Sequence, residues 1–387
     1  MGVTLAIAVA ACSAAPTSSS APDTTTRAAT TPPSGAAGTE APTISYPGVE
    51  WATEDPVTAG FDKDKLDAIA ARAEAGASNC FLVSRHGKIV DERYWKKATP
   101  DTAQEVFSAT KSYTSTLVGI AQDEGKLKVT DKASAYIPEW AGTPSTDVTV
   151  ENLLKNDSGR HWDAKTDYTD MTIRAKDKTA FAIGLGQDAP PGTVWAYNNS
   201  AIQTLSAVLK SATGVDASTY AQDKLLAPIG MAHSTLKRDA SGGSLTFMGL
   251  SSTCRDMARF GYLMLRKGNW DGKQIVPAAW VEAATGRSSQ KLNAAYGCLW
   301  WLNRKGPIAS PLQPTTGEAG GDQKDGQLVP GAPEDMYFAL GFGNQIISVD
   351  PGSDTVVVRL GPGRAPAGSG PFTQKDTAAV VTDALTE

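Results

Sequence analysis

The sequence predicts an α+β fold in which an antiparallel sheet is built from both ends of the chain, with a mainly helical lobe inserted between its strands. Two observations predict it. Short β-type segments lie near both ends of the globular region and follow one another through tight turns, which favours antiparallel pairing. The long segment between them shows the apolar spacing of helices instead. We expect one such domain over residues 46–387, because the composition becomes globular only from about residue 46.

The expected elements follow in chain order. The first half of the sheet is preceded by a helix, and its two strands are joined by the tight turn Arg85-His-Gly-Lys88. The helical lobe covers about 105–266. The later strands include a pair joined by the turn Asp350-Pro-Gly-Ser-Asp354. The expected ranges are a helix over 62–75, strands over 80–84 and 88–95, strands over 297–302, 336–340, 345–349 and 355–360, and a helix over 374–385.

The N-terminal region predicts the cellular location of the protein. Residues 1–12 form a short apolar run that ends in Val9-Ala-Ala-Cys12, a pattern similar to the lipobox of bacterial lipoproteins. The run is too short to span a bilayer, so we interpret it as a signal segment with Cys12 as the lipidation site. Residues 13–45 are rich in Ser, Thr, Pro and Ala, which is typical of a disordered linker. We therefore expect an extracytoplasmic protein anchored by lipid to the bacterial cell membrane.

Ser108-Ala-Thr-Lys111 is the strongest candidate for catalytic chemistry. Residues three apart on a helix are neighbours, so the hydroxyl of Ser108 and the amine of Lys111 can lie within hydrogen-bond reach. A serine hydroxyl needs a base to become a good nucleophile, and a buried lysine can be that base because burial lowers its pKa. The apolar-periodic run up to Gly125 predicts the supporting helix. The alternative is that Ser108 only caps this helix.

The same Ser-x-x-Lys pattern occurs twice more, so the context has to decide between the three. Ser234 to Lys237 lies in turn-type sequence beside two glycines, and Ser288 to Lys291 lies in a polar stretch. Only Ser108 is followed by a core-type helix. A second element supports it, because Tyr197-Asn-Asn199 lies in a Pro/Gly-rich loop before another helix. Its phenol can relay protons, and Asn199 can bind a substrate carbonyl or the lysine.

With these elements the chain resembles the serine β-lactamase and penicillin-binding-protein superfamily, in particular the class C-related branch with its carboxylesterases and 6-aminohexanoate-dimer hydrolases. The resemblance covers roughly residues 50–385. Its motifs are Val106-Phe-Ser-Ala-Thr-Lys111-Ser, Leu153-Leu-Lys-Asn-Asp-Ser-Gly159, Pro191-Gly-Thr-Val-Trp-Ala-Tyr197-Asn-Asn199, Gly249-Leu-Ser-Ser-Thr and Ala295-Tyr-Gly-Cys-Leu-Trp-Trp301.

The resemblance implies a β-lactamase/DD-peptidase-like fold and a serine hydrolase that cleaves a small amide or ester through an acyl-enzyme. By carry-over, Ser108 is the nucleophile, Lys111 its base and Tyr197 the proton shuttle. Tyr168 lies in the region where a tyrosine of the amidase branch closes over the substrate, and the alternative is an exposed loop tyrosine. The alternatives are a β-lactamase or DD-peptidase, or a non-catalytic binding or sensor protein of the cell envelope.

The chain departs from this family at its third motif. Relatives that act on β-lactams or peptidoglycan carry Lys-Thr-Gly or His-x-Gly on an inner strand, and no Lys-[Ser/Thr]-Gly occurs here. The corresponding segment runs from Tyr337 to Gln345, and we expect Gly341, Phe342 and Gln345 to contact the substrate. A backbone N–H near Gly341 or Phe342 can complete an oxyanion hole with that of Ser108.

Other chemistries have little support in the sequence. The three histidines His86, His161 and His233 are scattered, and no Gly-x-Ser-x-Gly elbow or phosphate-binding loop occurs. We therefore expect no metal and no cofactor, and the net charge of −5 argues against a nucleic-acid partner. Apart from Cys12, the chain has three cysteines, which allow one disulfide at most. We expect Cys80 and Cys254 to form it and Cys298 to be a small buried hydrophobic residue.

Overall fold

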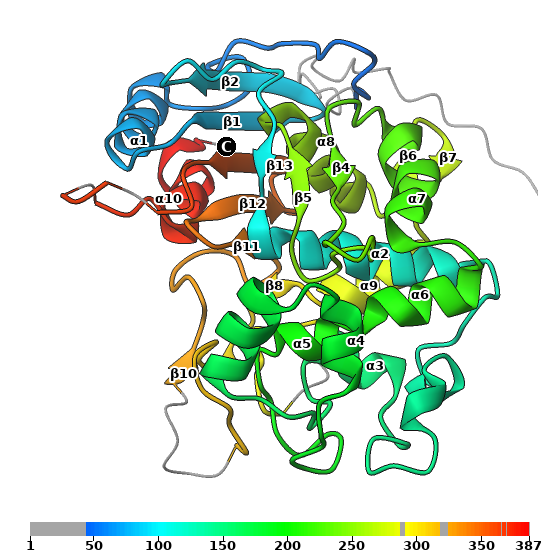
Figure 1. The fold of residues 1–387 in the computed structure, drawn as a ribbon. Helices are drawn as coiled ribbons and strands as arrows, with labels where there is room; N and C mark the ends of the chain where they lie inside the picture. The colour runs from blue at the N-terminus through cyan, green and yellow to red at the C-terminus, as the bar shows by residue number, and fades with distance from the viewer. Residues whose placement is uncertain (1–43, 287–290, 318–323, 365, 369, 387) are drawn as a thin grey trace, which may run out of the picture. The chain divides into compact units, whose positions relative to one another are not determined.

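A six-stranded antiparallel sheet with the order β2-β1-β13-β12-β11-β8 organises the fold (Figure 1). The computed structural model describes residues 44–286, 291–317, 324–364, 366–368 and 370–386. The signal segment and most of the linker, with Cys12, therefore lie outside the described residues. The strands are β1 (Cys80–Arg85), β2 (Lys88–Tyr94), β8 (Trp301–Leu302), β11 (Tyr337–Gly341), β12 (Gln345–Asp350) and β13 (Thr355–Leu360).

Strands from the first and the last parts of the described residues pair in the middle of this sheet. Strand β1 pairs with β13 over its whole length, from Cys80 opposite Leu360 to Arg85 opposite Thr355. The β1–β2 turn places His86 and Gly87 in the left-handed region, with φ of 54° and 78°, as a two-residue hairpin turn requires. The prediction of an α+β fold with a sheet from both chain ends is confirmed.

The side chains of β1 alternate between two helical layers, as the period of a strand requires. Phe81 and Val83 face a hydrophobic cluster that includes residues of α1 (Lys63–Ala75). Helix α10 (Gln374–Ala379) packs against β12 and β13 of the same sheet. Leu82 belongs to the main core on the other face, where α8 (Cys254–Leu265) lies against β1, β12 and β13. Cys80 is joined to Cys254 by a disulfide with a Cα–Cα distance of 6.5 Å, the pairing expected from the sequence.

The helical lobe lies beside the sheet, and a small sheet marks where the chain enters and leaves it. This sheet consists of β3 (Gln104–Glu105), β5 (Leu250–Ser252) and β4 (Thr235–Leu236). The lobe contains α3 (Val150–Lys155), a π-helical segment (Thr166–Arg174), α4 (Lys178–Ile183), α5 (Asn199–Gln203), α6 (Leu205–Thr213) and α7 (Ala217–Ala221). Helix α2 (Thr110–Asp123) packs against α6, α9 (Ala278–Thr285) and β11, between the lobe and the sheet.

The expected boundaries need three corrections. The lobe does not reach residue 266, because α8 covers the sheet and Gly261 lies close to the side chains of Val356 and Ile347. The strand expected over 297–302 is reduced to β8, because Leu299 adopts a left-handed φ of 58° that no strand tolerates. The last helix changes to a π-helical turn after α10.

Two small two-stranded sheets were not expected at all. They are β6 (Asn269–Trp270) with β7 (Lys273–Gln274), and β9 (Gly306–Ile308) with β10 (Lys324–Gly326). Within the described ranges, every helix is too short or too polar to cross a bilayer.

Candidate active site

Ser108 lies in a single 3-10 turn (Phe107–Ala109) directly before α2. Helix α2 begins at Thr110, and Ala109 occupies its N-cap position without a side-chain hydrogen bond. The hydroxyl of Ser108 is therefore not used to cap the helix, and the capping interpretation of the motif is wrong. Phe107 adopts a left-handed φ of 49°, so the backbone turns sharply immediately before the serine.

Helix α2 is buried on all sides from Thr110 to Ala121, although every side chain of its first two turns, from Thr110 to Thr116, carries a polar group. Short hydroxyl side chains make this possible, because they donate to carbonyl groups of neighbouring segments. Ser112 Oγ donates to the carbonyl of Leu299 at 2.9 Å, and Thr114 Oγ1 donates to that of Thr246 at 2.7 Å. These two hydrogen bonds hold α2 both to the segment before β8, at Leu299, and to the segment before β5, at Thr246.

Lys111 is the central group of the site. Its side chain is 1 % exposed, and Nζ lies 2.9 Å from Ser108 Oγ, 2.7 Å from Asn199 Oδ1 and 2.8 Å from the carbonyl oxygen of Phe247. Burial lowers the pKa of Lys111 to about 7. The two oxygens of Asn199 and Phe247 can only accept, so they take both N–H groups of the neutral amine. The lone pair then faces the hydroxyl of Ser108.

Tyr197 lies on the loop before α5 and brings a phenol to the same serine. Its ring centroid is 4.8 Å from Lys111 Nζ, and it packs against Trp301 at 5.7 Å and Tyr296 at 6.1 Å. Burial raises the pKa of Tyr197, while a hydrogen bond to Ser108 opposes this rise. The phenol is consequently neutral near pH 7 and can pass a proton on, whereas Lys111 is the group able to accept one.

Asn199 contacts the lysine, which decides between the two roles that the sequence left open. Its Oδ1 accepts from Lys111, and its Nδ2 donates to Asp167 Oδ2 at 2.7 Å. Asp167 was missed by the sequence analysis. It lies in the π-helical segment directly before Tyr168, and no local pattern distinguishes it from the neighbouring aspartates Asp163 and Asp170.

Tyr168 and Trp162 flank the site from the lobe. The hydroxyl of Tyr168 donates to the carbonyl of Pro311 at 3.2 Å, and its ring lies 6.4 Å from that of Trp162 in an edge-on arrangement. Trp162 Nε1 in turn donates to the carbonyl oxygen of Tyr197 at 3.1 Å. Tyr168 is therefore placed beside the catalytic candidates, and Trp162 is a neighbour that the sequence analysis did not single out.

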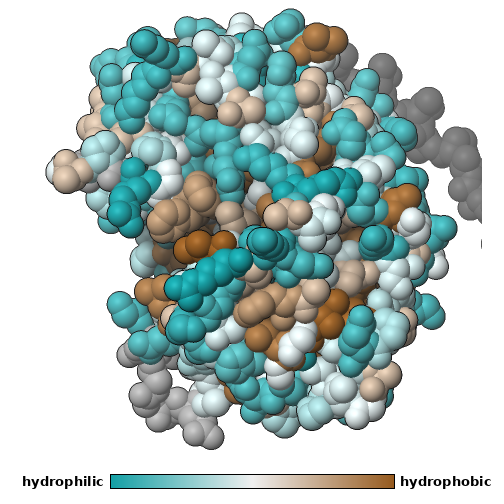
Figure 2. Space-filling view, viewed as in Figure 1, coloured by the Kyte–Doolittle hydropathy of each residue, from teal (hydrophilic) through white to brown (hydrophobic). Residues whose placement is uncertain are grey.

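The end of β11 forms the opposite side of the site. A Cβ on Gly341 would lie 2.1 Å from the carbonyl oxygen of Val106, so only glycine lets the strand approach the backbone before the serine. Phe342 is 63 % exposed and packs edge-on against Phe107 at 5.7 Å. Figure 2 shows the surface hollowed beside β11, between sheet and lobe, with hydrophobic side chains in the hollow.

Gln345 needs a correction. It was expected to contact the substrate, but its side chain is fully buried. Its Oε1 accepts from the backbone N–H of Gly361 at 2.9 Å, and its Nε2 donates to the carbonyl of Phe342 at 3.1 Å. Gln345 therefore holds the turn between β11 and β12 and has no free polar group to offer a substrate.

The comparison with known families decides the identity of the fold. The family model described as Beta-lactamase matches residues 65–380. The chain belongs to the β-lactamase family. A 6-aminohexanoate-dimer hydrolase of Paenarthrobacter ureafaciens is 26 % identical over 347 residues, which cover 79 % of this chain and 80 % of the relative. Protein flp of Staphylococcus aureus (strain MW2) is 28 % identical over 179 residues, 42 % of this chain and 35 % of flp.

Two solved structures show the same fold. A Bacillus anthracis protein provisionally named 6-aminohexanoate-dimer hydrolase has a TM-score of 0.66 at 20 % identity, covering 88 % of this chain and 86 % of its own. A Bacteroides dorei protein provisionally named β-lactamase has a TM-score of 0.63 at 20 % identity, covering 84 % of this chain and 100 % of its own. The β-lactamase-family assignment makes the chain a serine hydrolase-like protein, as expected from its motifs.

The other Ser-x-x-Lys pattern in the described residues has a structural role. Ser234 Oγ donates to Asp256 at 2.8 Å, and Lys237 Nζ lies 3.7 Å from Glu105, so this serine and lysine do not pair. Ser288 lies outside the described residues.

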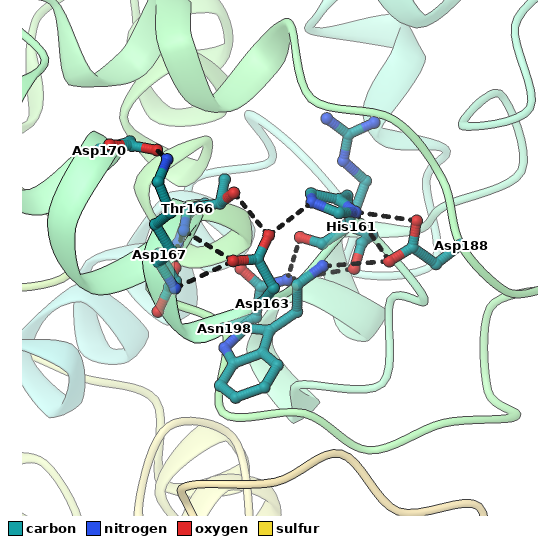
Figure 3. Close-up of polar contacts among 11 residues, drawn as sticks. His161, Asp163, Thr166, Asp167, Asp170, Asp188 and Asn198 are labelled. Atoms are coloured by element: carbon teal, nitrogen blue, oxygen red, sulfur yellow. Dashed lines mark hydrogen bonds and ion pairs between the residues drawn. The ribbon is translucent and has the colours of Figure 1, made fainter.

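The histidines are likewise engaged away from Ser108. His86 contacts Asp354 at 2.7 Å and His233 lies 3.4 Å from Asp101. Figure 3 shows His161 between Asp163 and Asp188. Among the described residues, no three His, Cys, Asp or Glu side chains are grouped so that they could hold a metal ion.

Proposed function

We propose that the protein hydrolyses esters and linear amides of small molecules through an acyl-enzyme on Ser108. One observation carries this proposal. Burial lowers the pKa of Lys111 to about 7, its Nζ lies 2.9 Å from the Ser108 hydroxyl, and its other two partners can only accept, so the neutral amine can take the proton of the serine. At pH 7 about half of such lysines are neutral, which is the condition that a general base needs.

In the proposed reaction, Lys111 takes the proton of Ser108 while Oγ attacks the carbonyl carbon of the substrate. The negative oxygen of the tetrahedral intermediate accepts hydrogen bonds from the N–H of Ser108 and an N–H at the end of β11, near Gly341. Tyr197 passes the proton from Lys111 to the leaving alcohol or amine. Water then loses a proton to the same base and attacks the acyl carbon. The bond from this carbon to Oγ breaks, Lys111 returns the proton to Oγ, and the acid leaves.

The proposed substrate class is supported by β11, whose sequence Tyr337-Phe-Ala-Leu-Gly341 contains no cationic side chain. A β-lactam or a peptidoglycan stem peptide carries a carboxylate, and a charge-assisted hydrogen bond to it contributes about 1.5–3 kcal/mol. Without this contact, kcat/KM for such substrates falls roughly tenfold to a hundredfold or more. Esters and linear amides do not need it. The relative from Paenarthrobacter ureafaciens, named a 6-aminohexanoate-dimer hydrolase, supports a linear amide.

A labelling experiment tests the proposed chemistry. The protein is treated with a fluorophosphonate, and the modified peptide is identified by mass spectrometry. We expect the label on Ser108, no label in Ser108→Ala, and labelling close to the wild type in Ser234→Ala, a control that removes the serine of the other described Ser-x-x-Lys pattern. An unlabelled wild-type protein that binds small molecules without turnover would instead favour the non-catalytic binding protein.

A kinetic comparison tests the substrate class. We expect readily measurable kcat/KM for p-nitrophenyl acetate, detectable hydrolysis of a 6-aminohexanoate dimer, and slow or absent hydrolysis of nitrocefin. Nitrocefin turnover at the level of a dedicated β-lactamase would show that another residue supplies the carboxylate contact, and would favour the β-lactamase alternative.

We also propose that the protein is anchored by lipid on the outer face of the bacterial membrane through Cys12. The support is the motif Val9-Ala-Ala-Cys12, followed by a linker rich in Ser, Thr, Pro and Ala. In a bacterial host, the wild type is expected in the membrane fraction, and Cys12→Ser is expected to be released or left unprocessed. Full-length protein with an intact Met1 in the cytosol would contradict the proposal.

A further inference from the structure

Asp167 has a buried carboxylate, and the groups that donate hydrogen bonds to it all belong to two consecutive residues, Asn199 and Ser200. It is 1 % exposed. Its Oδ2 accepts from the backbone N–H and Nδ2 of Asn199 at 3.2 and 2.7 Å, and its Oδ1 accepts from the backbone N–H and Oγ of Ser200, at 2.7 and 2.8 Å. A buried carboxylate without a cation in hydrogen-bond contact is costly, so four donors converging on it call for an explanation.

The carboxylate fixes which way the amide of Asn199 points. An ionised carboxylate can only accept, so the group facing Asp167 must be the NH₂ group of the amide. The carbonyl oxygen Oδ1 is then left for Lys111 Nζ, 2.7 Å away. If the amide turned over, its NH₂ group would face the amine, and the neutral lysine would have to direct its lone pair at Asn199 instead of Ser108.

We infer that Asp167 is a positioning residue of the hydrolytic site, which acts through Asn199 to hold the Lys111 amine with its lone pair on Ser108. This inference rests on the proposed function, because it assigns a task to the base of that reaction. Asp167 itself does not touch the serine. The relay runs from the Asp167 carboxylate through the Asn199 amide to the Lys111 amine.

The charge of Asp167 also reaches the amine. Burial lowers the pKa of Lys111, and the Asp167 carboxylate opposes this effect. The other titratable groups near the carboxylate are the phenols of Tyr168 and Tyr197, whose pKa values are raised mainly by burial. Burial raises the pKa of Asp167 itself, and the hydrogen bonds from Ser200 and Asn199 oppose this rise by stabilising the carboxylate. Because both phenols are neutral near pH 7, the Asp167 carboxylate is the charge that acts on the base.

The position of Asp167 is itself held by the contacts drawn in Figure 3. Asp163 accepts from the backbone N–H groups of Lys165 and Thr166 at 2.9 Å, which fixes the start of the π-helical segment. His161 bridges Asp163 and Asp188 at 3.0 and 2.9 Å. The carboxylate is therefore presented to Asn199 from a fixed turn, as a positioning group requires.

The test compares Asp167→Asn with Asp350→Asn as a matched control. Asp350 is also 1 % exposed and accepts from the N–H of a serine, Ser353, at 3.0 Å, but it is the last residue of β12, before the turn to β13. The titration of Lys111 Nζ is followed by NMR of lysine-labelled protein, with Lys111→Met identifying the signal. The pH profile of kcat on p-nitrophenyl acetate is measured in parallel.

We expect the midpoint of the Lys111 titration, and with it the acid limb of the kcat profile, to move to lower pH in Asp167→Asn only. The maximal kcat should fall about tenfold to a hundredfold, because a neutral side-chain amide in place of the carboxylate can no longer fix the orientation of Asn199. KM should change little, since Asp167 does not contact the substrate. In Asp350→Asn, the titration should stay at the wild-type midpoint.

Unchanged titration and kcat in folded Asp167→Asn, or equal losses in both variants, would overturn the inference. If Asp167→Asn does not fold, Asn199→Ala cuts the relay while the carboxylate keeps its contacts with Ser200, and full activity of that variant would overturn it too. The NMR titration needs no turnover. A wild-type protein without acyl-enzyme formation would therefore refute the proposed function, while a shifted Lys111 midpoint would still support the role of Asp167 toward the amine.

Discussion

Replacing Lys111 by methionine should change the stability of the protein in a way that depends on pH. A lysine has an ordinary pKa of 10.5, and burial brings that of Lys111 to about 7. Between these values the unfolded chain holds a proton that the folded protein has lost. Stability therefore rises with pH over this window, because the unfolded state binds more protons. Methionine fills a similar volume without titrating, so the variant lacks this dependence.

The size of the effect follows from the two pKa values. Below pH 7 the buried lysine lowers the free energy of unfolding by about 5 kcal/mol, at about 1.4 kcal/mol for each pH unit between 7 and 10.5. From pH 7 to pH 9 the wild type should therefore gain about 2 kcal/mol relative to Lys111→Met. The absolute difference at one pH is less informative, because the variant also leaves Asn199 Oδ1 and the Phe247 carbonyl without a donor, at about 1–3 kcal/mol each.

Urea unfolding of both proteins at pH 7, 8 and 9 measures this dependence. Other titrating groups are common to both proteins and cancel in the difference. Lys273→Met, which removes an exposed lysine on β7, is measured in parallel as a control for the loss of a lysine. A difference for Lys111→Met that stays flat with pH would show that Lys111 keeps its proton in the folded protein up to pH 9. It could then not act as the base, and the proposed mechanism would be refuted.

Three further predictions concern the surroundings of the site. Gly341→Ala should lower kcat at least tenfold, because its Cβ would push β11 away from the Val106 carbonyl and displace the oxyanion donor; unchanged kinetics would place that donor elsewhere. Replacing Cys80 and Cys254 by alanine should lower the free energy of unfolding by about 2–5 kcal/mol in denaturant titrations, because the disulfide closes a loop across 174 residues. His161 has a raised pKa through its two aspartate partners, so the stability lost in His161→Gln should be largest below pH 6.5 and should vanish as the pH rises through the folded-state value.

The fold could be predicted from the sequence because its signals are local. Tight turns such as Arg85-His-Gly-Lys88 fix antiparallel neighbours, and the apolar strand residues Phe81 to Val83 mark a strand buried on both faces. The boundaries that were wrong depend on tertiary contacts. The sequence of α8 is that of an amphipathic helix wherever it packs, and only the close approach of Gly261 to the sheet places it outside the lobe.

The catalytic candidates were predictable for a different reason. Ser108 and Lys111 are neighbours on one helix, so their spacing alone brings them together. Tyr197 and Asn199 were predicted to lie beside them because the motifs of the family follow one another in the same order in this chain. Asp167 lies 32 residues before Asn199, and its contact depends on the course of the loop between them. No local sequence pattern predicts such a contact.

The burial of α2 links the stability of the protein to its proposed chemistry. A lysine in water is charged near pH 7 and cannot accept a proton, so a lysine base requires a site that keeps water out. Helix α2 supplies this site by surrounding Lys111 with packed groups, and Ser112 and Thr114 satisfy their own polar atoms on neighbouring carbonyls. The acceptors that hold the amine, on Asn199 and Phe247, are therefore needed as much as the burial. Burial alone would make the lysine neutral, but only these two oxygens direct its lone pair at Ser108.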